Sequence, residues 1–271
     1  MANEDLLSER REGVLYLTMN RPAKLNALSP TLMSGLVEEL SVAAADPEIG
    51  VVVLTGAGRG FCAGGDVSAM NASNQPGASA GTPAPTIEEG VARLRRGETA
   101  SQLLHEMPKV TIAAVNGPAA GAGLSLALAC DLRIAADNAR FGTAFAKVGF
   151  SGDFGGTYSL TQLVGPAKAR ELYFLADVIG ADEALNIGLV NRVVPAATLM
   201  EEVKAIANRI ARGPRIAYGY MKANLNAALP PSLAANLDRE ALGQTLTGRT
   251  QDHKEAARAF VEKREPKFVG R

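Results

Sequence analysis

The sequence predicts an α/β fold in which buried strands alternate with helices. Two short, continuous apolar runs, VVVLTG at 51–56 and VTIAAVNG at 110–117, end in glycine and are typical of strands buried on both faces. Helical patterns alternate with these strands, and from about residue 197 only helical patterns remain. We therefore expect an α/β core over residues 1–196 and a C-terminal helical module over residues 197–271.

The first elements follow from local patterns. GVLYLTMN at 13–20 alternates between apolar and polar positions as a strand does. Ser29 and Pro30 form an N-cap followed by a first-turn proline, and the helix they open is expected to end at Asp46-Pro47. Residues 71–86 are small, polar and rich in Pro and Gly, so we expect a surface loop that admits substrate.

The helical module is divided by two further signals. Gly213-Pro214 and Pro230-Pro231 are expected to separate its helices. The last helix is expected to start with Asp252 and Glu255 in a D-x-x-E capping arrangement.

Composition excludes several classes of protein. The 271 residues carry 28 basic and 28 acidic side chains, so no overall field attracts nucleic acid or an anionic membrane. No apolar stretch reaches the roughly 18 residues of a membrane span, and the charged N-terminus lacks a signal-peptide core, so we expect a cytoplasmic protein. Cys62 and Cys130 have no metal-binding spacing, so we expect no metal and read both as small buried residues.

Two segments in which a strand runs into glycines, 51–66 and 110–131, are the strongest functional signals. A dinucleotide-binding motif fails because its third glycine is Phe61, and a P-loop fails because Asp66 stands where lysine is required. Tight turns are one interpretation of these glycines. The other is an oxyanion hole, because small residues at helix N-termini leave backbone N–H groups open to a ligand.

Six segments carry a resemblance to a known family. In chain order they are RPAKLNALS, GRGFCAGGDVSAM, NGPAAGAGLSLALACD, FGTAFAKVGFSGDFGGTYSL, ADEALNIGLVNRVVP and AFVEKREPKF. The chain resembles the crotonase superfamily, the enoyl-CoA hydratase/isomerase group, from about residue 13 to the C-terminus. The resemblance implies a spiral of ββα turns, a C-terminal helical module that supports a homotrimer or a dimer of trimers, and acyl-CoA substrates. It implies no cofactor, because coenzyme A enters as part of the substrate.

The resemblance also implies residue roles. The backbone N–H groups of Ala63 and Ala122 would polarise the thioester carbonyl. The substrate site would further include Gly64, Gly65, Asp66, Gly123 and Phe145. Coenzyme A would contact Lys24, Phe260 and Lys263. For Lys263 the alternative is an ordinary surface position on an amphipathic helix.

The catalytic groups depart from the hydratase pattern. Hydratases of this family use two glutamates, and the matching positions here are Ser125 and Phe145. A phenylalanine cannot exchange a proton with water, which argues against ordinary hydration. Asp153, eight residues past Phe145, matches an aspartate of dienoyl-CoA isomerases and of the ring-epoxide isomerase of phenylacetyl-CoA breakdown.

The resulting hypothesis is an isomerase in which Asp153 moves a proton on an unsaturated or epoxidised acyl-CoA. The local alternative for Asp153 is an N-cap for a helix that starts near Gly156. Two other functions stay open, an enoyl-CoA hydratase and an acyl-CoA-binding protein without catalytic activity.

Overall fold

A six-stranded sheet forms the centre of the computed structural model, which describes residues 4–73, 85–228 and 233–267. Its strands, in spatial order, are β1 (Leu6–Arg11), β2 (Val14–Met19), β3 (Val51–Gly56), β4 (Val110–Val115), β6 (Leu132–Ala136) and β9 (Arg192–Val194). The β1/β2 pair is antiparallel, and all other neighbours are parallel. A second sheet contains β5 (Ala119–Ala120), β7 (Arg140–Gly142) and β8 (Ile179–Gly180). The strands predicted within 13–20, 51–56 and 110–117 are confirmed.

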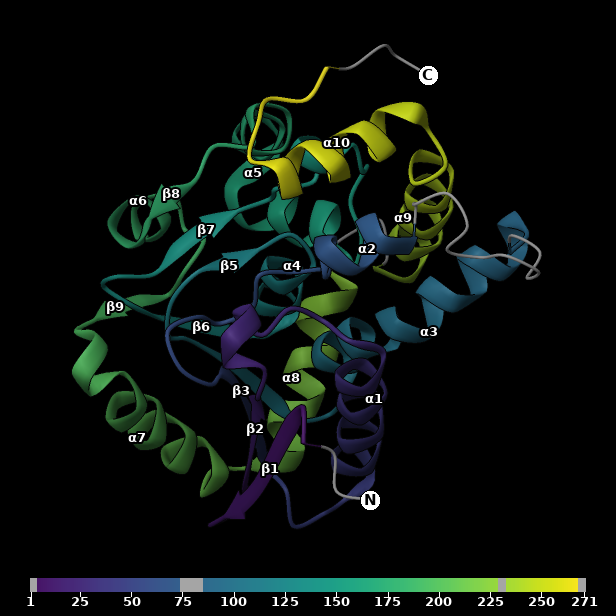
Figure 1. Cartoon of the computed structure of the whole chain (residues 1–271). Helices are drawn as coiled ribbons and strands as arrows, with labels where there is room; N and C mark the ends of the chain where they lie inside the picture. The colour runs from purple at the N-terminus through teal and green to yellow at the C-terminus, as the bar shows by residue number, and fades with distance from the viewer. Residues whose placement is uncertain (1–3, 74–84, 229–232, 268–271) are drawn as a thin grey trace.

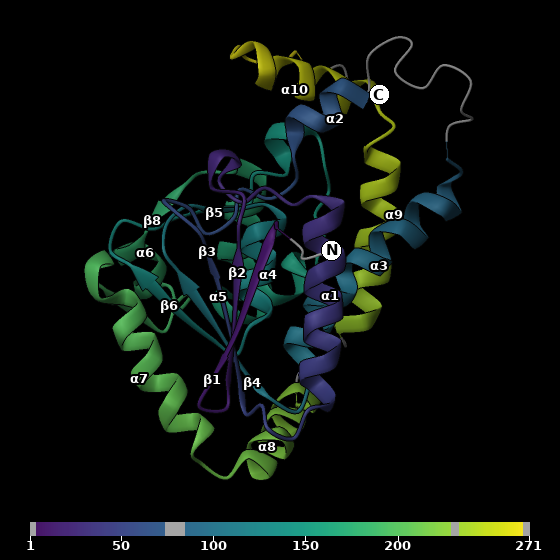
Figure 2. The same ribbon diagram turned by 60° about the horizontal axis from the view of Figure 1, so that its bottom comes forward.

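Helices cover both faces of the large sheet. Leu15 and Leu17 of β2 belong to the apolar cluster that contains α1 (Pro30–Ala45), whereas Val14 and Tyr16 belong to the cluster that contains α7 (Leu199–Ala211). Figure 2 shows α1 and α7 on opposite sides of the strands. Burial on both faces explains why the inner strands are continuous apolar runs rather than alternating ones.

The remaining helices surround this sheet and the second one (Figure 1). They are α2 (Val67–Ser73), α3 (Ile87–Glu106), α4 (Ala122–Ala129), α5 (Gly156–Leu175), α6 (Ala181–Asn186), α8 (Arg215–Ala227), α9 (Leu233–Thr247) and α10 (Gln251–Glu262). Single 3-10 turns occur at η1 (Pro22–Lys24), η2 (Ala146–Val148) and η3 (Ala196–Thr198). The predicted α/β architecture with helices after residue 197 is confirmed.

The C-terminal helices pack back onto the rest of the chain. In both views α9 lies beside α3 and α10 lies beside α2 (Figures 1 and 2). The division of the chain at residue 196 stays a prediction.

Helix starts show one confirmed and one wrong prediction. Ser29 caps α1 as expected, because its Oγ accepts the Leu32 N–H at 3.0 Å. The last helix begins at Gln251, and its N-cap is Thr250, whose hydroxyl accepts the His253 N–H at 3.0 Å. The capping arrangement predicted for Asp252 and Glu255 is therefore wrong.

The predicted loop at 71–86 is only partly within the described residues. Residues 71–73 are the end of α2, and residues 74–84 lie outside the described part. Thr86 opens α3 with a capping box, in which the Thr86 and Glu89 side chains each accept the other residue's backbone N–H. The break at Gly213-Pro214 is confirmed between α7 and α8, whereas Pro230-Pro231 lies outside the described residues.

The structure also bears on the predictions about membrane spans and cysteines. In the described part of the chain, no helix combines the length and the apolar character needed to cross a bilayer. Cys62 and Cys130 are free thiols buried in the core, as expected.

Candidate active site

Two segments meet beyond the ends of β3 and β4. Cys62 pairs with Ala119 in an isolated parallel bridge, which brings the segment after β3 against the segment after β4. Gly64 has a φ of +85°, and a Cβ there would lie 2.7 Å from the Ala120 carbonyl oxygen and 3.3 Å from the Ala122 nitrogen. Glycine is therefore required at position 64 for both backbone conformation and space.

Ala122 opens α4 directly beside this contact. Its N–H is the first of the helix, and such a group has no acceptor within the helix. The residue before it, Gly121, provides no side-chain cap, and Gly123 packs against the Cys62 backbone. The N–H of Ala122 is therefore available to a ligand oxygen, with the positive end of α4 behind it.

The structure corrects the expectation for Ala63. Its N–H donates to the Leu25 carbonyl oxygen at 2.9 Å, so it cannot also bind a thioester oxygen. The turn at Gly64 follows, and the N–H of Gly65 has no hydrogen-bond acceptor among the described residues. Gly65 therefore replaces Ala63 as the candidate donor in this segment.

Asp66 and Lys24, both predicted to contact ligand, form an ion pair. The Lys24 Nζ lies 2.9 Å from the Asp66 Oδ2, and the Arg21 guanidinium lies 3.5 Å from the same oxygen. The hydrogen bond from Lys24 is the main reason that the pKa of Asp66 is lowered. The Lys24 side chain is half exposed and can still reach a ligand at the surface.

Asp153 lies in the loop before α5 and is 7% exposed. Its Oδ2 accepts a hydrogen bond from the Gln244 Nε2 at 2.9 Å, while its Oδ1 is buried with no partner in the described part of the chain. The N-cap of α5 is Gly155, and the Asp153 carboxylate accepts no backbone N–H at the start of this helix among the described residues. The helix-cap alternative for Asp153 is therefore wrong.

Two more buried carboxylates hold the backbone that carries Asp153. The Phe154 N–H donates to the Glu98 Oε1 at 3.2 Å. The Gly155 and Thr157 N–H groups donate to the Glu240 carboxylate at 2.5 and 2.9 Å. Glu98 comes from α3 and Glu240 from α9, so these two helices supply the acceptors that the start of α5 requires.

This burial changes the proton affinity of all three carboxyl groups. Burial raises the pKa of Asp153 well above its ordinary value, and the charges of Glu240 and Glu98 raise it further. Burial raises the pKa of Glu98 to about 7 despite the Phe154 N–H and Arg95. Asp153 also lies near the first glycine segment, because its charge contributes to the raised pKa of the Cys62 thiol, whose main cause is burial.

Aromatic rings and small residues complete the surroundings. Phe145 stacks on Tyr173 with ring centroids 5.8 Å apart and planes 5° from parallel. A side chain at Gly156 would collide with the Ser125 hydroxyl and the Tyr173 hydroxyl, so these two groups lie beside the start of α5. Ser125 and Phe145 supply no carboxylate here. The start of α5, just after Asp153, lies against Ser125 through Gly156, and the charge of Asp153 reaches Cys62.

The helix α10 is anchored near the same loop. The His253 Nδ1 lies 2.6 Å from the Val148 carbonyl oxygen, and the His253 ring stacks on Phe150 at 4.0 Å. Phe260 is 58% exposed near the C-terminal end of α10, and Lys263 follows as its exposed C-cap. The CoA contacts expected of Phe260 and Lys263 stay predictions.

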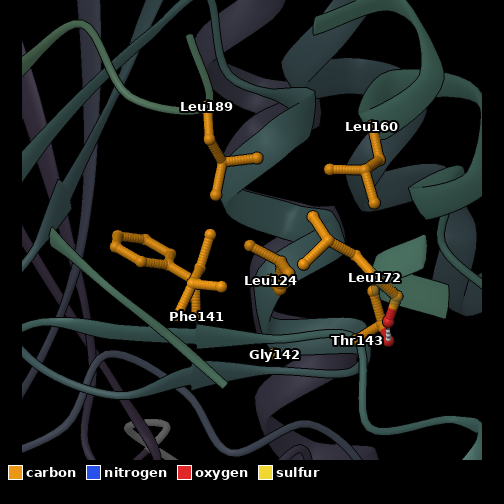
Figure 3. Close-up of a pocket in the computed structure, with 8 residues that line it drawn as sticks. Leu124, Phe141, Gly142, Thr143, Leu160, Leu172 and Leu189 are labelled. Carbon is orange, nitrogen blue, oxygen red and sulfur yellow. Dashed lines mark hydrogen bonds between the residues drawn. The ribbon is translucent and has the colours of Figure 1, made fainter. Parts of the chain in front are cut away.

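A small internal cavity lies between α4, α5 and the second sheet (Figure 3). Its volume is about 10 Å³, and its lining consists of Leu124, Phe141, Gly142, Thr143, Leu160, Leu172, Ile179 and Leu189. The Thr143 hydroxyl already donates to the Leu172 carbonyl oxygen at 2.8 Å, as the dashed line shows. A space of this size is at the limit for one water molecule, so it does not hold an acyl chain.

Sequence reasoning missed Gln244, Glu98, Glu240 and Tyr173. One signal was present on α9, where Glu240 and Gln244 lie on the same stripe as the buried Leu233, Leu237 and Ala241. Polar residues at the spacing of an apolar stripe indicate buried hydrogen-bonding groups. Glu98 was missed because it closely follows Arg95 and Arg96, and a charged residue in such a run is usually exposed.

Comparison with known proteins identifies close relatives along the whole chain. A family model described as enoyl-CoA hydratase/isomerase matches residues 9–271. A crotonyl-CoA hydratase of Syntrophomonas wolfei is 38% identical over 273 residues and covers 100% of both chains. A 1,2-epoxyphenylacetyl-CoA isomerase of Escherichia coli is also 38% identical and covers 99% of both chains.

Solved structures show the same fold. A crystal structure of an enoyl-CoA hydratase from Mycobacterium avium subsp. paratuberculosis is 34% identical, covers 98% of both chains and has a TM-score of 0.85. An enoyl-CoA hydratase/isomerase from Pseudoalteromonas atlantica is 30% identical, also with a TM-score of 0.85, and the match covers 98% of this chain and 100% of that one.

Proposed function

The chain belongs to the enoyl-CoA hydratase/isomerase family of the crotonase superfamily, and we propose that within it the protein is an acyl-CoA isomerase with Asp153 as its single base. The observation that carries this proposal is the Asp153 carboxyl, buried beside the glycine segments with one oxygen unpartnered among the described residues. Ser125 and Phe145 occupy the positions where the resemblance places the two hydratase glutamates.

The proposed reaction moves one proton and gains or loses no atoms. The N–H groups of Gly65 and Ala122 bind the thioester oxygen, each contributing roughly 2.7–4 kcal/mol as negative charge develops there. Asp153 removes a proton from a carbon conjugated with the carbonyl, and the electron pair of that C–H bond moves onto the thioester oxygen as an enolate. The same carboxyl then returns the proton to another carbon, so the double bond shifts and one base is enough.

The remaining features of the proposal follow the resemblance. The substrate is an unsaturated or ring-epoxidised acyl-CoA, the latter because the Escherichia coli relative is named an epoxyphenylacetyl-CoA isomerase. Gly64, Gly123 and Phe145 line the acyl group, and Lys24, Phe260 and Lys263 contact coenzyme A. No cofactor besides the coenzyme A of the substrate is needed, and the enzyme works in the cytoplasm as a homotrimer or a dimer of trimers.

Asp153→Asn tests the proposal. The amide keeps the size of the side chain but cannot take up a proton, so turnover of 3-enoyl-CoA to 2-enoyl-CoA should fall by roughly 10²–10⁴ while acyl-CoA affinity and folding persist. Asp238→Asn is the matched control, because Asp238 is exposed on α9 and pairs with Arg95. An Asp153→Asn enzyme that keeps more than about a third of the wild-type kcat would contradict a general-base role.

A hydratase is the second candidate, because the crotonyl-CoA hydratase of Syntrophomonas wolfei matches with the same identity as the isomerase. Loss of the conjugated-thioester absorbance of crotonyl-CoA at a rate above that of the isomerisation would favour hydration. Tight binding of a panel of enoyl-CoAs without any turnover would instead favour the binding protein.

A further inference from the structure

The strongest unexplained feature of the site is a pair of unpartnered oxygens on two side chains that already contact each other. The Gln244 Nε2 donates to the Asp153 Oδ2 at 2.9 Å. The Gln244 Oε1 and the Asp153 Oδ1 are both buried, and neither has a hydrogen-bond partner among the described residues. Buried polar atoms without partners are rare in folded proteins and call for a physical cause.

The neighbouring carboxyl groups have hydrogen-bond partners at both oxygens. Glu98 accepts from the Phe154 N–H and from Arg95, one bond at each oxygen. Both oxygens of Glu240 likewise accept hydrogen bonds. Among the three buried carboxyl groups, only Asp153 therefore has an unpartnered oxygen. The other buried atoms without a partner among the described residues are the hydroxyls of Ser101 and Ser159.

Both unpartnered atoms are acceptors, so the donors that these two side chains already carry cannot satisfy both atoms. A single added proton can. A carboxylic acid and a primary amide are both flat, two-pronged groups. When the amide donates through the N–H on the side of its carbonyl oxygen, the acid O–H lies opposite that oxygen. We infer that Asp153 carries a proton on Oδ1 in the resting enzyme and donates it to the Gln244 Oε1, so that the two side chains form a closed pair with two hydrogen bonds.

The charges around Asp153 favour this state. Glu98 from α3 and Glu240 from α9 both disfavour a third negative charge, and no cation is among the groups that shift the pKa of Asp153. Burial raises that pKa well above the ordinary value, in the direction that the pair requires. Tyr173 of α5 is also near, because the Asp153 charge contributes to its raised pKa, after burial and Glu240.

Gln244 is then a positioning residue for the proton shuttle, and in this respect the inference rests on the proposed function. The reactive form is the enzyme that has released this resting proton to solvent. When its carboxylate has taken a proton from the substrate, the acid form again has a ready acceptor in the Gln244 Oε1. The pair holds the proton on the enzyme until it returns to the substrate, and it keeps the carboxyl plane fixed in both protonation states.

Infrared difference spectroscopy of the free enzyme at neutral pH tests the pair without any substrate. A carboxylic-acid C=O band that disappears in Asp153→Asn is expected in the wild type. In Gln244→Met the same band should move to higher wavenumber, because the acid loses both hydrogen bonds. Gln102→Met is the matched control, since the Gln102 side chain donates to the exposed Glu106 on α3, and it should leave the band in place.

Two results would overturn the inference. The first is the absence of an acid band sensitive to Asp153→Asn, which would show an ionised carboxylate. The second is a band that Gln244→Met leaves unmoved. If Gln244→Met does not fold, Gln244→Asn applies the same test with a polar side chain that is too short to close the pair.

The experiments distinguish a failure of the Asp153–Gln244 pair from a failure of the proposed function. Full turnover in Asp153→Asn together with the expected band shift would reject the catalytic role and keep the pair. An inactive Asp153→Asn enzyme whose wild type lacks the band would do the reverse.

Discussion

Asp153 acts as a base only when it is ionised, so its surroundings set the pH dependence of the proposed reaction. Burial and the charges of Glu240 and Glu98 raise its pKa, which means that the proton is lost only at a pH above the ordinary range of an aspartate. Below the raised pKa, Asp153 is protonated and cannot act as a base. We therefore expect kcat/KM for isomerisation to rise with pH through a limb that lies well above pH 4.

The measurement is a pH profile of kcat/KM with a 3-enoyl-CoA substrate. Glu240→Gln removes one of the two neighbouring charges and should move the limb to lower pH. A profile that is level from pH 5 upward would show that Asp153 keeps an ordinary proton affinity or is not the base.

Glu98 makes the free energy of unfolding depend on pH. Its pKa rises from 4.5 to about 7 on folding, so between these values the folded state holds a proton that the unfolded state has released. The free energy of unfolding therefore falls as the pH rises through this window, by up to roughly 1.4 kcal/mol per pH unit for one proton. In Glu98→Gln this contribution disappears, and the decline between pH 5 and 7 should be shallower.

Urea denaturation at several pH values measures this difference. Glu106→Gln, an exposed substitution on the same helix, should leave the slope of the wild type unchanged. An identical slope in Glu98→Gln and the wild type would mean that Glu98 is ionised throughout.

Among the elements, α9 supports the site directly, because its Glu240 accepts backbone N–H groups at the start of α5. Removal of this side chain in Glu240→Ala leaves the Gly155 and Thr157 N–H groups without their acceptor. We expect a loss of about 2–4 kcal/mol in the free energy of unfolding, since unsatisfied buried donors are costly. A decrease in kcat should accompany it, because the same loop carries Asp153.

Asp238→Ala on the same helix is the control for this experiment. Asp238 is 71% exposed and pairs with Arg95, and such pairs contribute about 0–1 kcal/mol. Equal losses in the two variants would show that Glu240 does not support α5.

Elements whose signals are local could be predicted from the sequence. The strands at 51–56 and 110–115 and the cap at Ser29 depend on neighbouring residues alone, and all three are confirmed. The start of α10 could not be fixed in this way, because Thr250 and Asp252 are both good caps. The contact of His253 with Val148 and Phe150 fits a start at Gln251, and that contact is tertiary.

The candidate site likewise contains residues that the sequence reveals and residues that only the structure reveals. Asp153 and Ala122 could be found from motif and family resemblance. The choice between Ala63 and Gly65 depends on the turn at Gly64 and on Leu25, which takes the Ala63 N–H. Gln244 is 91 residues from Asp153 in the chain, so only the packing of α9 reveals their contact.

At the scale of the whole molecule, exposed apolar side chains mark surfaces for association. On α8 they are Ile216, Tyr220, Met221 and Leu225, between 54% and 80% exposed. Further ones lie at the end of α5 and just after it, namely Phe174, Leu175 and Val178. Surfaces of this kind commonly form interfaces, so they are candidates for the contacts of the predicted trimer.

Light scattering should therefore give a mass above the 28.2 kDa of one chain. The double variant Ile216→Asp/Leu225→Asp places two charges on the α8 surface and should shift the protein toward the monomer. Leu7→Asp, on the half-exposed edge strand β1, should leave the assembly intact. A wild type that elutes and scatters as a monomer at micromolar concentration would reject the trimer.

In the proposed reaction, the groups that bind the thioester and the group that moves the proton are positioned by different parts of the fold. The N–H donors at Gly65 and Ala122 lie on the segments that follow β3 and β4, while the loop with Asp153 depends on carboxylates from α3 and α9. Under the proposed function, the acid/base group therefore depends on the loop before α5 and its two supporting helices, whereas the N–H donors for the thioester lie on other segments. Related chains can therefore acquire a new reaction through substitutions near Asp153, while the segments with Gly65 and Ala122 continue to bind coenzyme A esters.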